Sequence, residues 1–201
     1  GDLQNLQAIA VTLPEGNAQT FIRDGITRFR SVLGKFAIAG QLRGEHVNQA
    51  PITTSLQTLL GTLPQSLNNK LTQKAVQVTI GHDEPFVTTN PQLLAYVLAS
   101  LVDNAADYSD QNDVIEVNTA SDNMATTITV TDHGPGISPQ KMALLFKPFS
   151  QTQDVERFTH EGMGFSLYLD KLIATYLGGD IRLTSRPNVE TVATVTLPRP
   201  N

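Results

Sequence analysis

The sequence has 201 residues, 40% of them hydrophobic, which is enough for one sizeable core or for one core with an appendage. Its net charge of −5 argues against nucleic-acid binding, and the absence of cysteine excludes a disulfide framework and a thiolate metal site and fits a reducing compartment. No apolar run approaches the ~18 residues that span a bilayer, and no signal peptide is visible. We expect this part to be cytoplasmic, without membrane contact. Because it starts at Gly1 rather than Met, we also expect it to be a piece of a longer protein, which can carry a membrane anchor elsewhere.

The first predicted element is a helix over residues 17–43. Apolar side chains recur there at spacings of three and four: Phe21, Ile22, Ile26, Phe29, Val32, Leu33, Phe36 and Ala37. This stripe needs a partner, which the segment before Pro14 can supply as an antiparallel helix, although a core helix pair of the same domain fits the pattern equally. A linker over residues 44–52 follows. We therefore expect a helical segment over residues 1–45 and a second domain over residues 51–201.

Helices and strands are mixed without regular alternation in the second domain. The expected helices cover residues 56–71 (interrupted near Pro64), 90–109, 138–146 and 165–177. The expected strands cover residues 75–80, 85–89, 113–120, 126–132, 181–185 and 191–197, with a long polar loop at 150–163. This irregular mixture favours an α+β fold over a doubly wound parallel sheet.

The helix that follows Asn90 carries a first candidate site. Ser100 and Asn104 lie one turn apart on a face other than the apolar stripe, and Asp107 continues that line. A neutral amide oxygen is a reasonable ligand for Mg²⁺, which takes few protein ligands and completes its shell with water and substrate phosphates. A single polar residue on a helix is more often just a solvated side chain, so the motif is weak alone.

Two glycine-containing motifs follow. The strand that ends at Asp132 runs into Gly134 and Gly136; a carboxylate can accept from an exocyclic amino group, and glycines let the backbone approach a flat base. A Gly-Pro-Gly turn capped by Asp fits the same residues. Gly162 and Gly164 end the long loop where a helix begins, and such a helix N-terminus binds phosphate, although the spacing is not a dinucleotide fingerprint.

The order of these motifs resembles the ATP-binding domain shared by gyrase, a class of heat-shock chaperones, histidine kinases and a mismatch-repair ATPase, the GHKL superfamily. "LFKPFSQ", residues 145–151, is similar to the Phe-x-x-Phe box of histidine kinases, and "LGGDIRLTS" and "TVATVTLP" are similar to the closing strands of that family. The resemblance covers about residues 51–198. It implies the two-layer α/β sandwich of the Bergerat type, preceded in residues 1–45 by the second part of a dimerisation hairpin.

The resemblance also implies site residues. Asn104 would be the catalytic residue that holds Mg²⁺ on the phosphates of ATP, and Asp132 would bind the adenine amino group. The other residues implied to bind the nucleotide or frame its site are Gly134 and Gly136 beside the base, Phe146 and Phe149 at the root of a lid, Arg157 in that lid, Gly162 and Gly164 around the phosphates, Thr191 near adenine, and Ser100 and Tyr108 on the Asn104 helix. Residues 150–163 would be the lid, ordered by nucleotide.

The chain departs from the family pattern at three positions. Ser100 replaces a first Asn, where hydrolysing relatives carry Glu, so a water-activating ATPase is not expected. Asp107 replaces a basic residue that often touches phosphate, and Ser166 replaces a third glycine. These changes bear on affinity and rate more than on fold.

None of the four histidines, His46, His82, His133 and His160, matches the phosphoacceptor motif His-Glu-x-x-x-Pro; His46 comes closest but lacks the acidic neighbour. The resemblance therefore implies a histidine kinase that transfers the ATP γ-phosphoryl group to a hairpin histidine outside this sequence. Its partners would be its own dimerisation hairpin, a response regulator, and a second copy through the N-terminal helices. The three departures leave a nucleotide-binding pseudokinase, acting as scaffold or switch, as the alternative. A kinase of the anti-sigma type, which phosphorylates Ser on a partner, is less consistent with the hairpin-like N-terminus.

Overall fold

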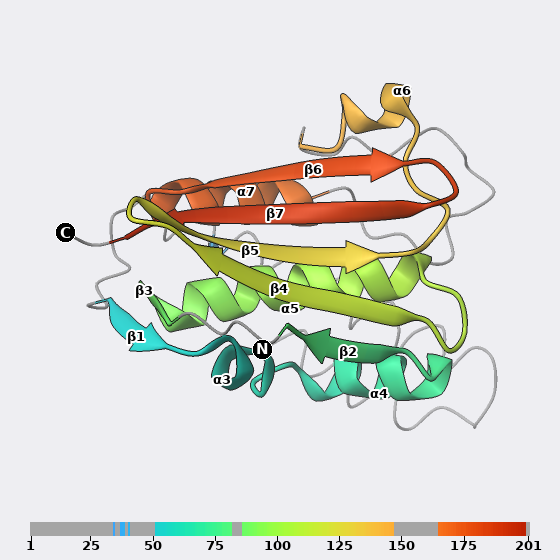
Figure 1. Cartoon of the computed structure of the whole chain (residues 1–201), viewed down its shortest axis with the longest axis horizontal. Helices are drawn as coiled ribbons and strands as arrows, with labels where there is room; N and C mark the ends of the chain where they lie inside the picture. The colour runs from blue at the N-terminus through green and yellow to red at the C-terminus, as the bar shows by residue number, and fades with distance from the viewer. Residues whose placement is uncertain are drawn as a thin grey trace, which may run out of the picture. The chain divides into compact units, whose positions relative to one another are not determined.

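The computed structural model describes residues 34, 37–38, 40, 51–81, 86–146 and 165–199 (Figure 1). The chain divides into two compact units, residues 1–47 and 48–201. The few described residues of the first unit are helical, and the rest of its predicted helix and antiparallel partner lies outside the described residues. The expected limits of the domains, hairpin and lid therefore stay predictions.

The described elements of the second unit alternate irregularly between helix and strand. In chain order they are β1 (Ile52–Thr54), α3 (Leu56–Leu60), α4 (Gln65–Lys74), β2 (Gln77–Ile80), β3 (Val87–Thr89), α5 (Pro91–Tyr108), β4 (Val114–Ser121), β5 (Ala125–Asp132), α6 (Pro139–Met142), α7 (Ser166–Tyr176), β6 (Asp180–Arg186) and β7 (Glu190–Pro198). Among these residues, no helix combines the length and apolarity that crossing a lipid bilayer requires.

These elements form a helical layer and a sheet. Five strands pair in the order β2-β4-β5-β7-β6, with β2 and β4 parallel and the other neighbours antiparallel. Helices α5 and α7 lie behind this sheet in Figure 1, where α5 contacts β4 and β5, and α7 contacts β6 and β7. This is the α+β, two-layer α/β sandwich that the sequence predicts.

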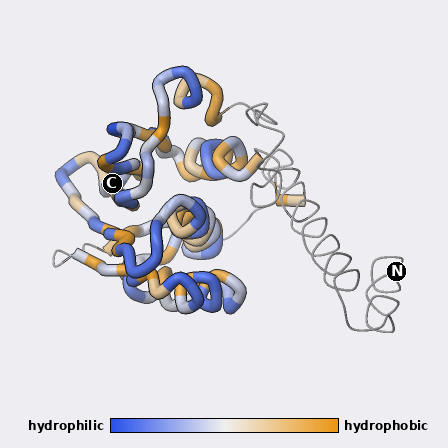
Figure 2. Tube along the Cα trace, turned by 90° about the vertical axis from the view of Figure 1, so that its right-hand side faces the viewer, coloured by the Kyte–Doolittle hydropathy of each residue, from blue (hydrophilic) through white to orange (hydrophobic). Residues whose placement is uncertain are grey.

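The core lies between the two layers because each contributes one apolar face. Along β5 every second residue is buried, as expected for an antiparallel sheet with one covered face. Figure 2 shows the corresponding mixture of apolar and polar residues along the chain. The largest fully buried side chains include Leu94, Leu98 and Val102 of α5, Leu169 and Ile173 of α7, and Ile115, Ile128 and Ile181 of the sheet.

Local signals fix where α5 begins. The Asn90 side chain accepts hydrogen bonds from the backbone N–H groups of Gln92 and Leu93, both at 3.1 Å, and Pro91 occupies the first helical position. The predicted interruption near Pro64 is also confirmed, because α3 ends at Leu60 and α4 begins after Pro64.

Two sequence predictions were wrong in detail. The region predicted as a linker ends in a strand, β1, which pairs antiparallel with β3 in a separate two-stranded sheet. The helix predicted over residues 138–146 is a single turn, α6, followed by turns over residues 143–146. Ser138 and Pro139 start that helix as predicted, but α6 buries no residue, so packing does not extend it.

Candidate nucleotide-binding site

The candidate site starts on α5, whose apolar stripe faces the core and turns Ser100 and Asn104 to another side. The Ser100 hydroxyl donates a 2.8 Å hydrogen bond to Asp170 Oδ2 on α7, and the Asp170 side chain is fully buried. Ser100, predicted to act at the nucleotide, therefore uses its hydroxyl to join two helices. Tyr108, the last residue of α5, has half of its surface exposed.

Asn104 shows the property expected of a ligand-binding residue. Its side-chain amide nitrogen is buried and makes no hydrogen bond among the described residues. Such an atom costs free energy unless water or a ligand supplies a partner. Within the same described residues, no group of three or more His, Cys, Asp or Glu side chains could hold a metal ion. The unpartnered amide nitrogen is a donor and can bind a phosphate oxygen, and the amide oxygen is of the ligand type that Mg²⁺ takes together with water and phosphate.

Asp132 is the buried carboxylate of the site. It ends β5, is only 7% exposed, and accepts a 3.1 Å hydrogen bond at Oδ1 from Gly134 N. The β5–β7 register places Thr191 directly opposite Asp132, and Thr191 is also buried. The Thr191 hydroxyl lies 3.1 Å from Ser185 Oγ, which donates to the Glu190 carbonyl at 2.9 Å. Asp132 Oδ2 makes no described hydrogen bond and can accept one from a ligand amino group.

Burial shapes the electrostatics of Asp132. It raises the pKa of this carboxyl, while the hydrogen bond from Gly134 and the nearby His133 act in the opposite direction without cancelling the effect. A partly desolvated carboxylate with one lone acceptor oxygen gains more from a donor than a solvated one does. Asp132 therefore fits the exocyclic amino group of adenine.

The two glycines after Asp132 are required by close backbone packing. A Cβ at Gly134 would lie 2.6 Å from the carbonyl oxygen of Tyr108, and a Cβ at Gly136 would lie 2.6 Å from that of Arg186. Gly136 also has φ +69°, which L side chains rarely adopt. The sequence interpretation gave a different reason for these residues, the approach of a base, and that reason stays a prediction.

Hydrogen bonds fix the same loop to the end of β6 and to the β6–β7 turn that follows it. Asn188 N donates to the Pro135 carbonyl at 2.8 Å, and Ile137 N donates to Ser185 Oγ at 2.8 Å. The segment after Asp132 is thus held between the end of α5 and this turn. Such support preorganises the carboxylate for a ligand.

Phe146 is the last described residue before the predicted lid, and Phe165 is the first after it. The ring centroid of Phe146 lies 5.6 Å from Lys171 Nζ of α7, which also forms an ion pair with Asp180. The remaining predicted residues, Phe149, Arg157, Gly162 and Gly164, lie outside the described residues.

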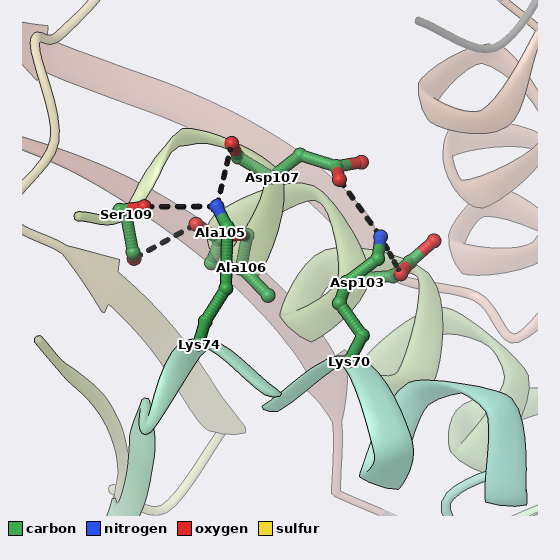
Figure 3. Close-up of polar contacts among 7 residues, drawn as sticks. All are labelled: Lys70, Lys74, Asp103, Ala105, Ala106, Asp107 and Ser109. Atoms are coloured by element: carbon green, nitrogen blue, oxygen red, sulfur yellow. Dashed lines mark hydrogen bonds and ion pairs between the residues drawn. The ribbon is translucent and has the colours of Figure 1, made fainter. Parts of the chain in front are cut away.

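Two lysines of α4, which the sequence interpretation missed, meet the end of α5 (Figure 3). Lys70 Nζ lies 2.5 Å from Asp103 Oδ1 and 2.8 Å from Asp107 Oδ1. Lys74 Nζ donates to the carbonyls of Ala106, Asp107 and Ser109 at 2.6, 3.2 and 3.0 Å. Their spacing of four on a helix was the available signal, because it places both on one face.

The structure therefore gathers several of the predicted residues around one end of the sandwich. The carbonyl of Tyr108 abuts Gly134, so the end of α5, with Asn104 one turn earlier, lies against the loop that begins at Asp132. Thr191 lies across the strand pair from Asp132. A buried acceptor for an amino group and an unpartnered amide nitrogen one helical turn from the loop are features that suit a purine nucleotide.

Known sequences share this domain. Residues 89–201, more than half of the chain, match the family described as histidine kinase-, DNA gyrase B-, and HSP90-like ATPase. An uncharacterised sensor-like histidine kinase of Rhizobium meliloti is 29% identical over 134 residues, 66% of this chain and 26% of the relative. The sensor protein BceS of Halalkalibacterium halodurans is 29% identical over 148 residues, 73% of this chain and 43% of the relative. The chain thus spans less than half the length of either relative.

Solved structures share the fold. The histidine kinase AdeS of Acinetobacter baumannii matches with a TM-score of 0.75 at 17% identity, over 99% of this chain and 94% of that chain. Full-length ShkA in complex with AMPPNP also matches with a TM-score of 0.75, at 15% identity, over 100% of this chain and 44% of that chain. At these identities the likeness establishes the architecture alone.

Proposed function

The chain belongs to the family of histidine kinase-, DNA gyrase B- and HSP90-like ATPases, and from this premise we propose that it is the ATP-binding catalytic domain of a two-component sensor histidine kinase. The names of its relatives, sensor proteins and sensor-like histidine kinases, favour this function over a pseudokinase. The observation that carries the proposal is the buried Asp132 carboxylate beside Thr191, with one acceptor oxygen left for the adenine amino group.

Each end of the nucleotide has a candidate partner in this proposal. Asp132 and Thr191 bind the adenine, and Asn104 holds a Mg²⁺ on the phosphates through its amide oxygen. When bound, that ion neutralises phosphate charge during transfer. The protein contributes positioning and charge rather than a nucleophile. The residues outside the described ranges complete the site in the proposal: Phe149, Arg157, Gly162 and Gly164, with residues 150–163 as the lid.

The acceptor in this proposal is a histidine on a helical hairpin outside the sequence, with residues 1–45 as the second part of that hairpin and residues 51–201 as the catalytic domain. Dimerisation through the hairpin and a response regulator that receives the phosphoryl group complete the assembly. His133, the one histidine among the described residues, lies 3.4 Å from Glu116 on the exposed side of the sheet and is not proposed as an acceptor.

Two measurements on the 201-residue chain test the proposal. Calorimetric titration with ATP, ADP and a non-hydrolysable analogue, with and without Mg²⁺, should show binding in the micromolar to millimolar range that depends on the ion. A separate helical hairpin bearing a His-Glu-x-x-x-Pro motif should then acquire acid-labile phosphohistidine. Bound ATP and Mg²⁺ without any phosphohistidine would exclude the kinase and favour the pseudokinase. A folded chain that binds no nucleotide would exclude both.

A further inference from the structure

Lys70 stands between two carboxylates at the end of α5. Its ammonium lies 2.5 Å from Asp103 Oδ1 and 2.8 Å from Asp107 Oδ1, and Figure 3 shows it reaching across from α4 toward both side chains. All three side chains are partly exposed, at 32%, 49% and 36%. Pairs this accessible stabilise a fold little, because solvent screens them and long side chains lose entropy. A contribution to folding is thus a weak explanation for the arrangement.

The position of the cluster gives a stronger explanation. Asp107 follows Asn104 by three residues and so neighbours it on the surface of α5, whereas Asp103, directly before Asn104, lies one turn from Asp107 and shares its Lys70 partner. The last turn of α5 contains no basic residue, and the C-terminal end of a helix carries partial negative charge. An ATP polyphosphate placed at Asn104 would therefore meet negative charge from two side chains and a helix end.

Each of the two lysines of α4 compensates one of these two sources of negative charge, the helix end or the side-chain carboxylates. Lys74 donates to the carbonyls of Ala106, Asp107 and Ser109, and so covers the helix end. Lys70 forms ion pairs with the two side-chain carboxylates, Asp103 and Asp107. Partial burial acts to lower the pKa of Lys70, but the hydrogen bonds with Asp103 and Asp107 outweigh it and the net shift is upward, so the ammonium stays charged at neutral pH.

We propose that Lys70 is a positioning residue for the nucleotide polyphosphate: by binding Asp103 and Asp107 it offsets part of the negative charge at the end of α5 beside Asn104, which permits phosphates and their divalent cation to bind there. This inference rests on the proposed function. It also accounts for Asp107, an acidic residue at the edge of a phosphate site, because its charge is compensated from α4. The same cluster makes phosphate affinity depend on the packing of α4 against α5.

The test compares adenosine with its phosphorylated forms, which share the base and the sugar and add the charged polyphosphate. Lys70→Ala should leave adenosine affinity unchanged while weakening Mg²⁺–ADP and, more strongly, Mg²⁺–ATP, the latter by roughly tenfold, as expected for one additional uncompensated charge about 10 Å away at a protein surface. Lys70→Arg should retain ATP affinity, and Lys70→Ala with Asp107→Ala should recover most of it. The loss of affinity should shrink at high ionic strength.

Arg199→Ala is the charge-matched control, because Arg199 contacts the Asp122 carbonyl at the opposite end of β7 from Thr191.

A second variant keeps the test independent of any loss of folding at position 70. Asp107→Asn alone should strengthen Mg²⁺–ATP binding several-fold and leave adenosine unchanged. Equal weakening of adenosine and ATP by Lys70→Ala, or no change for either variant, would overturn the inference while the proposed function stands. Failure of the unmodified chain to bind any adenine nucleotide would overturn both.

Discussion

The Ser100 hydroxyl donates a 2.8 Å hydrogen bond to Asp170 Oδ2 and so joins α5 to α7 inside the helical layer. The Asp170 side chain is fully buried, and burial together with the Asp170 charge raises the pKa of Tyr96, one turn before Ser100 on α5. Helix α7 begins just after the predicted lid, at Ser166. The bond therefore connects the helix that carries Asn104 with the helix that leaves the lid.

Ser100→Ala should lower the free energy of unfolding by about 1–3 kcal/mol, because it removes one hydrogen bond from a buried carboxylate. Urea denaturation followed by circular dichroism measures the change. Ser66→Ala is the matched control, since Ser66 lies exposed on α4 and should change stability by no more than ~0.5 kcal/mol. Equal effects of the two substitutions would show that the bond to Asp170 contributes nothing.

Gly136→Ala should destabilise the protein more than Gly178→Ala. Both glycines have positive φ, +69° and +79°, so each substitution incurs backbone strain of ~1 kcal/mol. Only Gly136 would also drive its Cβ to 2.6 Å from the Arg186 carbonyl oxygen; at Gly178 the nearest atom is a proline ring carbon at 3.4 Å. The difference between the urea unfolding midpoints of Gly136→Ala and Gly178→Ala measures the destabilisation that comes from the Cβ contact. Equal losses would attribute the role of Gly136 to φ alone.

Asp132→Asn should weaken ATP binding roughly 10- to 100-fold, because a hydrogen bond to a charged group contributes about 1.5–3 kcal/mol. The folded state should persist, since the Asn oxygen can still accept from Gly134 N. Asp122→Asn is the matched control; Asp122 accepts from Met124 N and Ala125 N at the other end of β5. Inosine triphosphate, which has no exocyclic amino group, should bind the unmodified chain poorly and lose little with Asp132→Asn. Equal binding of ATP and ITP to the unmodified chain would contradict the role of Asp132.

The sequence predicted best those features that local signals or strict alternation encode. The start of α5 follows from Asn90 and Pro91, and the β4–β5 pairing follows from alternating apolar residues around the turn near Asp122. The sheet order was not accessible in this way. The parallel β2–β4 pair depends on contacts between distant segments, which one sequence does not display.

Side-chain partners were the least predictable part of the site. Ser100 reads as a polar residue on a solvated face, but its partner, Asp170, lies seventy residues later. From the sequence alone, Asp107 is an unfavourable charge beside a phosphate site, because the compensating Lys70 is on another helix. In both cases a charge or hydroxyl was correctly located along α5, while its partner depended on how the helices pack. The glycines after Asp132 were recognised as special, although the backbone atoms that exclude a Cβ there could not be named.

Asn104→Ala should reduce the dependence of ATP binding on Mg²⁺, whereas adenosine binding should stay within twofold. The amide nitrogen of Asn104 is buried without a partner among the described residues, so its loss removes little from the fold. Calorimetry at several Mg²⁺ concentrations gives the coupling between ion and nucleotide directly. Asn118→Ala, on the exposed face of β4, is the matched control. Unchanged coupling in Asn104→Ala would remove Asn104 from the metal site.

Acidification should affect the stability and the ligand affinity of the Asp132 site in opposite directions. Burial raises the folded-state pKa of this carboxyl above the value of 3.8 that an ordinary Asp has. Because the folded-state pKa is the higher of the two, the folded state binds more protons than the unfolded state at pH values between them. The ionised Asp132 therefore destabilises the fold at pH values above its folded-state pKa. This destabilisation decreases as the pH falls toward 3.8. Asp132→Asn should thus be more stable than the parent at neutral pH, by an amount that shrinks on acidification. Protonation removes the charged acceptor, so adenosine affinity of the parent should fall relative to Asp132→Asn over the same window. Parallel pH profiles of the two proteins, in both urea denaturation and adenosine titration, would contradict a buried, ionised Asp132 at the adenine.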